Sequence, residues 1–115
     1  MATTIFGISN CDTIKKAKKW LEQQDVEYTF HDYRKDGLDR AWLEQTELAL
    51  GWETMVNKRG TTYRQLDDEV KAGLSQQSAL DLMQEYPAMI KRPILQHNGL
   101  WYVGFKSAEY EEIFA

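Results

Sequence analysis

The residue best suited to chemistry in this sequence is Cys11, the single cysteine among 115 residues. It lies in the polar run Ser9-Asn10-Cys11-Asp12-Thr13, between a β-branched, apolar segment and a helical pattern. Free backbone N–H groups and the partial positive charge at a helix N-terminus both favour a thiolate. We therefore expect Cys11 to be reactive, with a pKa below the usual value of about 8.5. The alternative is a small, buried hydrophobic residue.

A second group of candidates lies at Arg92-Pro93, where a proline opens a strand pattern. The residues alone allow either a trans-proline that begins an edge strand or a cis-proline. Arg92 is either a solvated surface charge or a planar, multi-donor ligand for a carboxylate or oxyanion near the thiol.

Composition and spacing exclude several classes of function. Two distant histidines and one cysteine give no metal-ligand spacing. The net charge of -4, without a basic stripe, argues against direct nucleic-acid binding. No apolar run approaches the roughly 18 residues of a membrane span. One cysteine and no signal-peptide pattern indicate a cytoplasmic protein.

The elements that must position these residues follow from the hydrophobic periodicity. Strand patterns alternate with helical ones in the order β-α-β, a helical block, then β-β-α, and Asn98-Gly99 is typical of a type I′ hairpin turn. This order predicts an α/β, thioredoxin-like fold with a four-stranded mixed sheet. We expect one domain over residues 1–115, with a helical insertion at about 38–90. The predicted strands lie at 3–8, 26–33, 93–97 and 100–104, a polar connection follows at 34–37, and Ser75 and Ser107 are predicted to cap helices.

Four separated motifs carry a resemblance to a known family. They are Gly7-Ile8-Ser9-Asn10-Cys11-Asp12-Thr13, Asn57-Lys58-Arg59-Gly60-Thr61-Thr62, Met89-Ile90-Lys91-Arg92-Pro93-Ile94 and Val103-Gly104-Phe105-Lys106. In this order, and over essentially the whole chain, they resemble the ArsC-like family of arsenate reductases and Spx regulators, and its small YffB-type members in particular. The resemblance implies a thioredoxin-like fold with a helical insertion.

The resemblance also implies roles for individual residues. Cys11 becomes the nucleophile, Arg92 an anion-binding residue beside it, and Pro93 a cis-proline whose neighbouring backbone pairs with a thiol-bearing peptide such as glutathione. One of Asn57, Lys58 and Arg59 would occupy the position where arsenate reductases keep another arginine. Lys106 falls near the position where those enzymes have a third arginine. With Asn10 and Thr13, which flank the cysteine, these residues form the predicted binding site for glutathione or substrate.

The function that the resemblance implies is a glutathione-dependent thiol reductase. We expect no tightly bound cofactor; glutathione is the co-substrate, and it or a glutaredoxin supplies the second thiol that the chain lacks. One alternative is a glutaredoxin-linked arsenate reductase, although those enzymes carry a histidine where this chain has Gly7 or Ile8. The other is a non-catalytic, Spx-like regulator that binds RNA polymerase, but without the Cys-x-x-Cys switch, because Ile14 occupies the second position.

Overall fold

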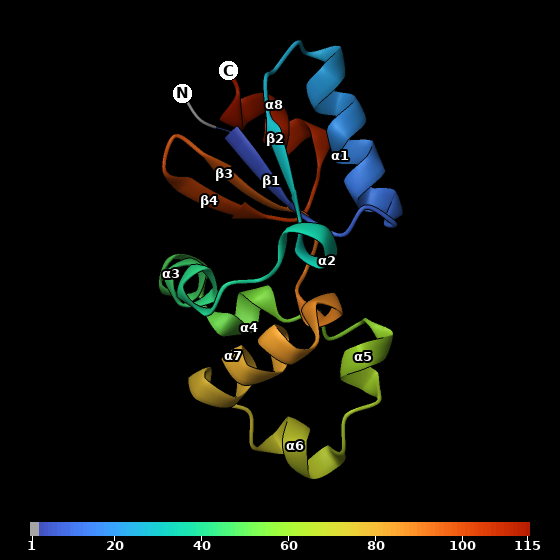
Figure 1. Cartoon of the computed structure of the whole chain (residues 1–115). Helices are drawn as coiled ribbons and strands as arrows, with labels where there is room; N and C mark the ends of the chain where they lie inside the picture. Colours follow the sequence, from blue (N-terminus) through green and yellow to red (C-terminus); the bar gives the residue numbers. More distant parts are fainter. Residues whose placement is uncertain (1–2) are drawn as a thin grey trace. The chain divides into compact units, whose positions relative to one another are not determined.

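The computed structural model describes residues 3–115, which divide into two compact units (Figure 1). One unit comprises the described residues up to Asp36 together with Arg92 to Ala115. The other unit runs from Gly37 to Lys91 and so covers the range in which we expected the helical insertion. Cys11 and Arg92 both belong to the first unit.

The first unit is built on a four-stranded mixed sheet with the strand order β2-β1-β3-β4. Strand β1 is parallel to β2 and antiparallel to β3, and β3 is antiparallel to β4. The predicted α/β fold with a four-stranded mixed sheet is therefore confirmed. The strands are β1 (Thr3–Gly7), β2 (Thr29–Asp32), β3 (Ile94–His97) and β4 (Leu100–Val103).

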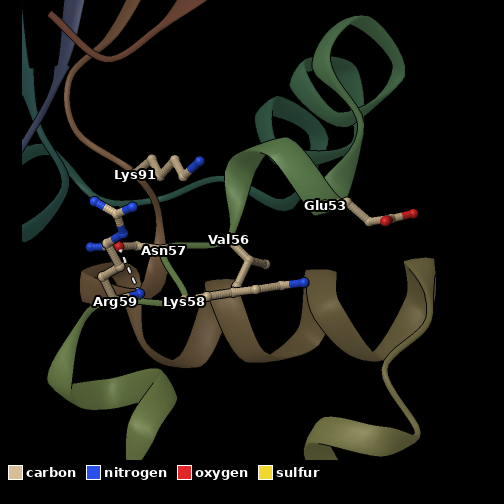
Figure 2. A pocket seen from close by; sticks show the side chains of 6 residues that line it. All are labelled: Glu53, Val56, Asn57, Lys58, Arg59 and Lys91. Atoms are coloured by element: carbon tan, nitrogen blue, oxygen red, sulfur yellow. Dashed lines mark hydrogen bonds between the residues drawn. The ribbon is translucent and has the colours of Figure 1, made fainter.

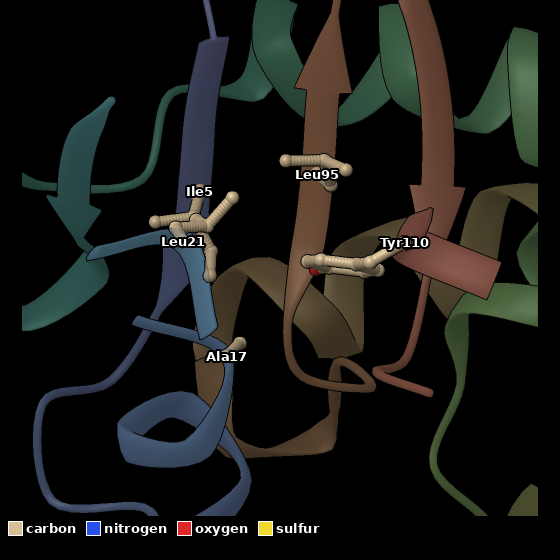
Figure 3. Close-up of a cluster of buried hydrophobic side chains, with 5 residues drawn as sticks. All are labelled: Ile5, Ala17, Leu21, Leu95 and Tyr110. Carbon is tan, nitrogen blue, oxygen red and sulfur yellow. The ribbon is translucent and has the colours of Figure 1, made fainter. Parts of the chain in front are cut away.

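Helices α1 (Asp12–Gln23) and α8 (Ser107–Ile113) pack against one face of this sheet. The contact is a cluster of side chains with no exposed surface (Figure 3). Burying an aliphatic side chain of this size contributes about 1.5–3 kcal/mol, so the cluster holds α1 firmly on the sheet. Its members are Ile5 of β1, Leu95 of β3, Ala17 and Leu21 of α1, and Tyr110 of α8.

The parallel strands β1 and β2 end together, and this edge is where the chain leaves the sheet for α1. Gly7, the last residue of β1, is the register partner of Asp32, the last residue of β2. The loop that leads to Cys11 therefore begins beside Asp32. A short helix, α2 (Tyr33–Asp36), follows β2 directly.

Three sequence-based boundaries can be compared with the structure. The second strand covers Thr29–Asp32 and not 26–33, and a helix, α2, begins at Tyr33 and occupies most of the range 34–37 where we expected a polar connection. The hairpin turn is confirmed, with φ of 52° at Asn98 and 81° at Gly99. Ser107 is the first residue of α8 and Lys106 precedes it as the N-cap, so the predicted cap is wrong by one position.

The second unit consists of helices, and the longest of them are α3 (Arg40–Leu50) and α7 (Gln76–Glu85). An ion pair of 2.7 Å joins Arg40 of α3 to Asp81 of α7. Ser75 caps α7 as predicted, in a capping box with Ser78. The shorter elements are α4 (Trp52–Met55), α5 (Thr61–Arg64), α6 (Asp68–Ala72) and the 3-10 helix η1 (Pro87–Met89).

The segments on either side of the basic loop are tied together inside this unit. Val56 and Ile90 form an antiparallel bridge, flanked by backbone hydrogen bonds from Asn57 to Met89 and from Lys91 to Met55, both 2.7 Å. The start of the loop and Lys91 are thereby fixed next to each other. Within residues 3–115, no helix is both long and apolar enough to cross a membrane.

Candidate functional site

Cys11 is the N-cap residue of α1, with extended backbone dihedrals (φ -148°, ψ 127°). Cys11 is half-buried. Partial burial disfavours the charged form of the thiol. The thiol makes no capping hydrogen bond to the first turn of α1, but the nearby Ile14 backbone N–H, the Arg92 side chain and the Thr13 backbone N–H favour the thiolate and, with the positive charge of Arg92, outweigh that effect. The net result is a pKa of Cys11 below its ordinary value.

Arg92 is far from Cys11 in the sequence and reaches the thiol because it lies two residues before β3, the neighbour of β1. The Arg92–Pro93 peptide bond is cis, and the Pro93 carbonyl accepts a 2.8 Å hydrogen bond from the Gly104 N–H. Tyr33 lies buried at the start of α2; burial raises the pKa of its phenol, and the positive charge of Arg92 opposes that rise. Arg92 thus lies near both the thiol and this phenol.

Gly7 allows α1 to start close to the sheet. A Cβ at this position would overlap Ile14 Cδ1 and would lie 3.1 Å from Ile14 Cγ1 and 3.8 Å from Arg92 Cγ. Ile14 is fully buried, so its side chain would have to shift within the core. The absence of a side chain at Gly7 is therefore what allows the first turn of α1 and Arg92 to approach the end of β1.

Asp32 is a site residue that the sequence analysis missed. It is buried, with 3% of its surface exposed, and its carboxylate accepts a 2.9 Å hydrogen bond from the Arg34 backbone N–H. Burial raises the pKa of this carboxyl, but the Arg34 backbone, the side chain and backbone of Ser9 and the Lys35 backbone together hold it below its ordinary value. The only signal in the sequence was an acidic residue at the end of one of two neighbouring parallel strands, beside the loop that leads to the cysteine.

The predicted basic loop lines a pocket of about 300 Å³ within the second unit (Figure 2). Asn57, Lys58 and Arg59 all contribute to its wall, and the Asn57 side-chain oxygen accepts a 3.2 Å hydrogen bond from the Arg59 N–H. Lys91 adds a third cation that the sequence analysis did not single out, and Glu53 adds one carboxylate. Such a pocket is suited to small molecules with carboxylates and an ammonium group.

The remaining predicted site residues have the following places. Thr13 is the second residue of α1, and its backbone N–H helps to lower the pKa of Cys11. Asn10 is exposed in the loop before α1. Lys106 is exposed at the N-cap of α8, two residues beyond Gly104, which is bonded to Pro93. The first unit therefore groups Cys11, Thr13 and Arg92, with Pro93 next in the chain, whereas the basic loop forms its own pocket in the second unit.

Among residues 3–115, no group of three or more histidine, cysteine, aspartate or glutamate side chains is arranged to hold a metal ion. The chemistry that the arrangement in the first unit offers is that of an activated thiol. A stabilised thiolate with a guanidinium beside it can attack sulfur or another electrophile and can bind an anion.

Comparison with known proteins identifies the family. The family model described as ArsC family matches residues 6–113, which is nearly the whole chain. The chain belongs to the ArsC family.

Two relatives illustrate the range of this similarity. An uncharacterized protein of Haemophilus influenzae is 49% identical over 112 residues, which cover 97% of this chain and 98% of the relative. The global transcriptional regulator Spx of Staphylococcus aureus is 28% identical over 110 residues, which cover 92% of this chain and 82% of the regulator.

Two solved structures agree with the fold. The YffB protein superposes with a TM-score of 0.93 at 44% identity, covering 99% of this chain and 100% of the other. An arsenate reductase (ArsC) related protein from Brucella melitensis superposes with a TM-score of 0.84 at 47% identity, covering 99% and 95% of the two chains. The resemblance found in the sequence motifs is thus confirmed.

Proposed function

We propose that this protein is a thiol reductase that uses Cys11 as its nucleophile and glutathione as its co-substrate. The observation that supports the proposal is the environment of the Cys11 sulfur, where two backbone N–H groups and the Arg92 guanidinium favour the thiolate. A thiol that is ionised near neutral pH, and still accessible, is the requirement for rapid thiol–disulfide exchange.

The proposed reaction has two exchange steps. In the first step, the Cys11 thiolate attacks the glutathione sulfur of a mixed disulfide, and the substrate leaves as a thiolate and takes up a proton. In the second step, a glutathione thiolate attacks the glutathione sulfur bound to Cys11, which releases oxidised glutathione and regenerates the Cys11 thiolate. In total, one mixed disulfide and one glutathione give one substrate thiol and one oxidised glutathione. The second thiol comes from outside, since Cys11 is the only cysteine in the chain.

Binding of glutathione or substrate is assigned in this proposal to residues around the thiol and in the basic loop. The backbone next to Pro93 would pair with the peptide backbone of glutathione, and Arg92 would hold a carboxylate or stabilise the departing thiolate. Lys106 is a further proposed cation of the first unit, and the pocket that Asn57, Lys58 and Arg59 line within the second unit is proposed to bind carboxylate groups of glutathione or substrate. The proposal draws support from the positive charge of the pocket that the loop lines.

Turnover of a glutathionylated peptide, coupled to glutathione reductase and followed by NADPH oxidation, tests the proposal. We expect turnover that depends on glutathione and that disappears in Cys11→Ser. Cys11→Ser protein that retained the full glutathione-linked turnover would rule the proposal out. An excess of a glutaredoxin in place of glutathione shows whether the second thiol comes from that partner.

Arsenate reduction is the second candidate function, because a similar structure is described as an arsenate reductase (ArsC) related protein. The structure offers an argument against it. The histidine that arsenate reductases carry before the cysteine has no room at Gly7, where even a Cβ overlaps Ile14, and Ile8 is buried. A coupled assay with arsenate, glutathione and glutaredoxin decides the matter, and turnover at background rate would remove this candidate.

A regulatory role is the third candidate and is supported by the similarity to the global transcriptional regulator Spx. In this alternative the chain binds RNA polymerase and Cys11 is not used in turnover. Purified polymerase immobilised on beads would retain the protein under the regulatory alternative. No retention, with an Spx protein retained in parallel as the positive control, would count against it.

A further inference from the structure

The turn between β3 and β4 consists of an asparagine followed directly by a glycine, Asn98-Gly99, at the tip of the hairpin (Figure 1). Both residues are exposed. His97 and Leu100 are the pair that closes the turn, so the backbone N–H of Gly99 is not part of the ladder between the two strands. A Cβ added at Gly99 would meet no atom within 4 Å, and the turn is therefore open around this residue.

An asparagine that precedes a glycine can react with its own backbone. The nitrogen of the next residue attacks the side-chain carbonyl carbon Cγ and closes a succinimide ring, while the amide nitrogen Nδ2 leaves as ammonia. Glycine favours this attack, since it has no side chain to block the approach and the least restricted backbone. Water then opens the ring and leaves either aspartate or isoaspartate. The slow point is the departure of the amide nitrogen, which needs a proton.

The residue before the asparagine places an imidazole at this nitrogen. His97 Nε2 lies 3.2 Å from Asn98 Nδ2, which is within the reach of a general acid. The other ring nitrogen, Nδ1, lies 2.7 Å from the hydroxyl oxygen of Thr3, a buried residue that is the register partner of His97 on β1. The ring also contacts Phe114, with 4.4 Å between the ring centroids. The imidazole is thus held on two sides, with one nitrogen directed at the amide.

The hydrogen bonds of this imidazole define what it can do. An amide nitrogen only donates, so neutral His97 accepts from Asn98 at Nε2 and carries its proton on Nδ1, which donates to Thr3 Oγ1. Protonation places a second N–H on Nε2, opposite the amide nitrogen. Because histidine is the side chain that gains and loses a proton near neutral pH, it is suited to deliver that proton to the leaving group.

We propose that Asn98 is a site of self-modification, at which Gly99 closes a succinimide on the Asn98 side chain and His97 is the general acid. The bond between Asn98 Cγ and the Gly99 nitrogen forms, and the bond between Asn98 Cγ and Nδ2 breaks. The Gly99 N–H proton passes to water, His97 gives a proton to Nδ2, and the imidazole takes a proton back from water. Ring opening consumes one water molecule. No atom changes its oxidation state, and Cys11 takes no part.

The product changes the hairpin in two ways. Aspartate and isoaspartate both add a negative charge beside His97. Isoaspartate also adds one carbon atom to the main chain between positions 98 and 99, which a two-residue type I′ turn does not accommodate. Because β4 is an edge strand next to β3, the turn sets its register. Conversion to isoaspartate should therefore loosen β4.

The experiment follows the full chain during incubation at neutral pH and measures the converted fraction of each asparagine by peptide mapping and mass spectrometry. We expect residue 98 to convert in the wild type. Asn10 and Asn57 are internal controls, because a cysteine and a lysine follow them, and they should stay intact. Asn98→Gly keeps a residue that tolerates positive φ in the turn and should show no conversion at this position.

Two variants test the imidazole. His97→Gln removes the proton donor and should slow conversion of Asn98 about tenfold, which is less than a general acid contributes in an enzyme site. Thr3→Val keeps the imidazole but removes the hydroxyl that holds Nδ1, and it should slow conversion by a smaller factor. Cys11→Ser should convert at the wild-type rate, so this inference and the proposed thiol chemistry fail independently of each other.

The modification is refuted if residue 98 stays asparagine in the wild type, or converts no faster than Asn10 and Asn57. A His97→Gln protein that converts at the wild-type rate would show that His97 is not the general acid. Should His97→Gln fail to fold, Thr3→Val decides, and an unchanged rate in Thr3→Val then removes the role of the positioned imidazole.

Discussion

Gly7 offers a quantitative test of how the fold positions the first turn of α1. In Gly7→Ala the new Cβ overlaps Ile14 Cδ1 and lies 3.1 Å from Cγ1, while Ile14 is fully buried against the sheet. Overpacking of this kind costs about 1–3 kcal/mol. We predict that Gly7→Ala lowers the free energy of unfolding by that amount. Since the Ile14 backbone N–H also favours the thiolate, the pKa of Cys11 should rise in the same variant.

A second substitution identifies the clash as the cause. Ile14→Val removes the Cδ1 atom that the Cβ added by Gly7→Ala would overlap. Alone, Ile14→Val lowers the free energy of unfolding by about 0.5–1.5 kcal/mol. The double variant Gly7→Ala/Ile14→Val should therefore be more stable, by about 1 kcal/mol, than the sum of the two single losses in the free energy of unfolding predicts. Urea unfolding of the four proteins measures the cycle.

The matched control is Gly73→Ala, at the end of α6 in the second unit, where the added Cβ lies 3.3 Å from the Glu69 carbonyl oxygen. Gly73→Ala and Ile14→Val should be additive, since the two residues belong to different compact units of the chain. Additive effects of Gly7→Ala and Ile14→Val, or a Gly7→Ala protein as stable as wild type, would refute the assignment of Gly7 to this close approach.

Three further predictions concern the thiol, a helix cap and a buried acid. Arg92→Met should raise the pKa of Cys11 by about 1–2 units, because both a hydrogen bond and a positive charge are lost, and alkylation against pH measures the change. Ser75→Ala should lower the free energy of unfolding by about 1 kcal/mol, through loss of the capping box on α7, as measured by urea unfolding. Although burial opposes it, the hydrogen bonds at Asp32 hold the pKa of this carboxyl below its ordinary value. Its ionised form therefore stabilises the protein above about pH 4, and the stability difference between wild type and Asp32→Asn should shrink as the pH falls below that value.

The positions of Cys11 and of the strands could be predicted because local signals agree with the tertiary structure. A β-branched segment, a run of capping residues and a helical apolar pattern place the cysteine at the start of α1. The Asn98-Gly99 turn fixes the register of the last hairpin, since both residues adopt positive φ. These features depend on neighbouring residues, so a single sequence contains them.

Other features depend on residues far apart in the chain and were missed for that reason. Asp32 appeared to be one more polar residue of an alternating strand, and its burial follows only from the pairing of β2 with β1 and from the path of the Ser9 loop. The proximity of Arg92 to Cys11 was implied by family resemblance alone; in the structure it follows from the pairing of β3 with β1. The end of the second strand was predicted one residue too late, since the start of α2 at Tyr33 goes with the Asp32 carboxylate that accepts the Arg34 N–H; nothing local in the sequence marks its beginning at Thr29.

The most direct test of the proposed chemistry is the rate of Cys11 alkylation against pH, measured with and without glutathione. We predict a pKa clearly below about 8.5 and slower alkylation in the presence of glutathione, because a bound glutathione would cover a thiolate that Arg92, Thr13 and Ile14 stabilise. A pKa near 8.5 together with no effect of glutathione would contradict a working thiolate beside a glutathione site.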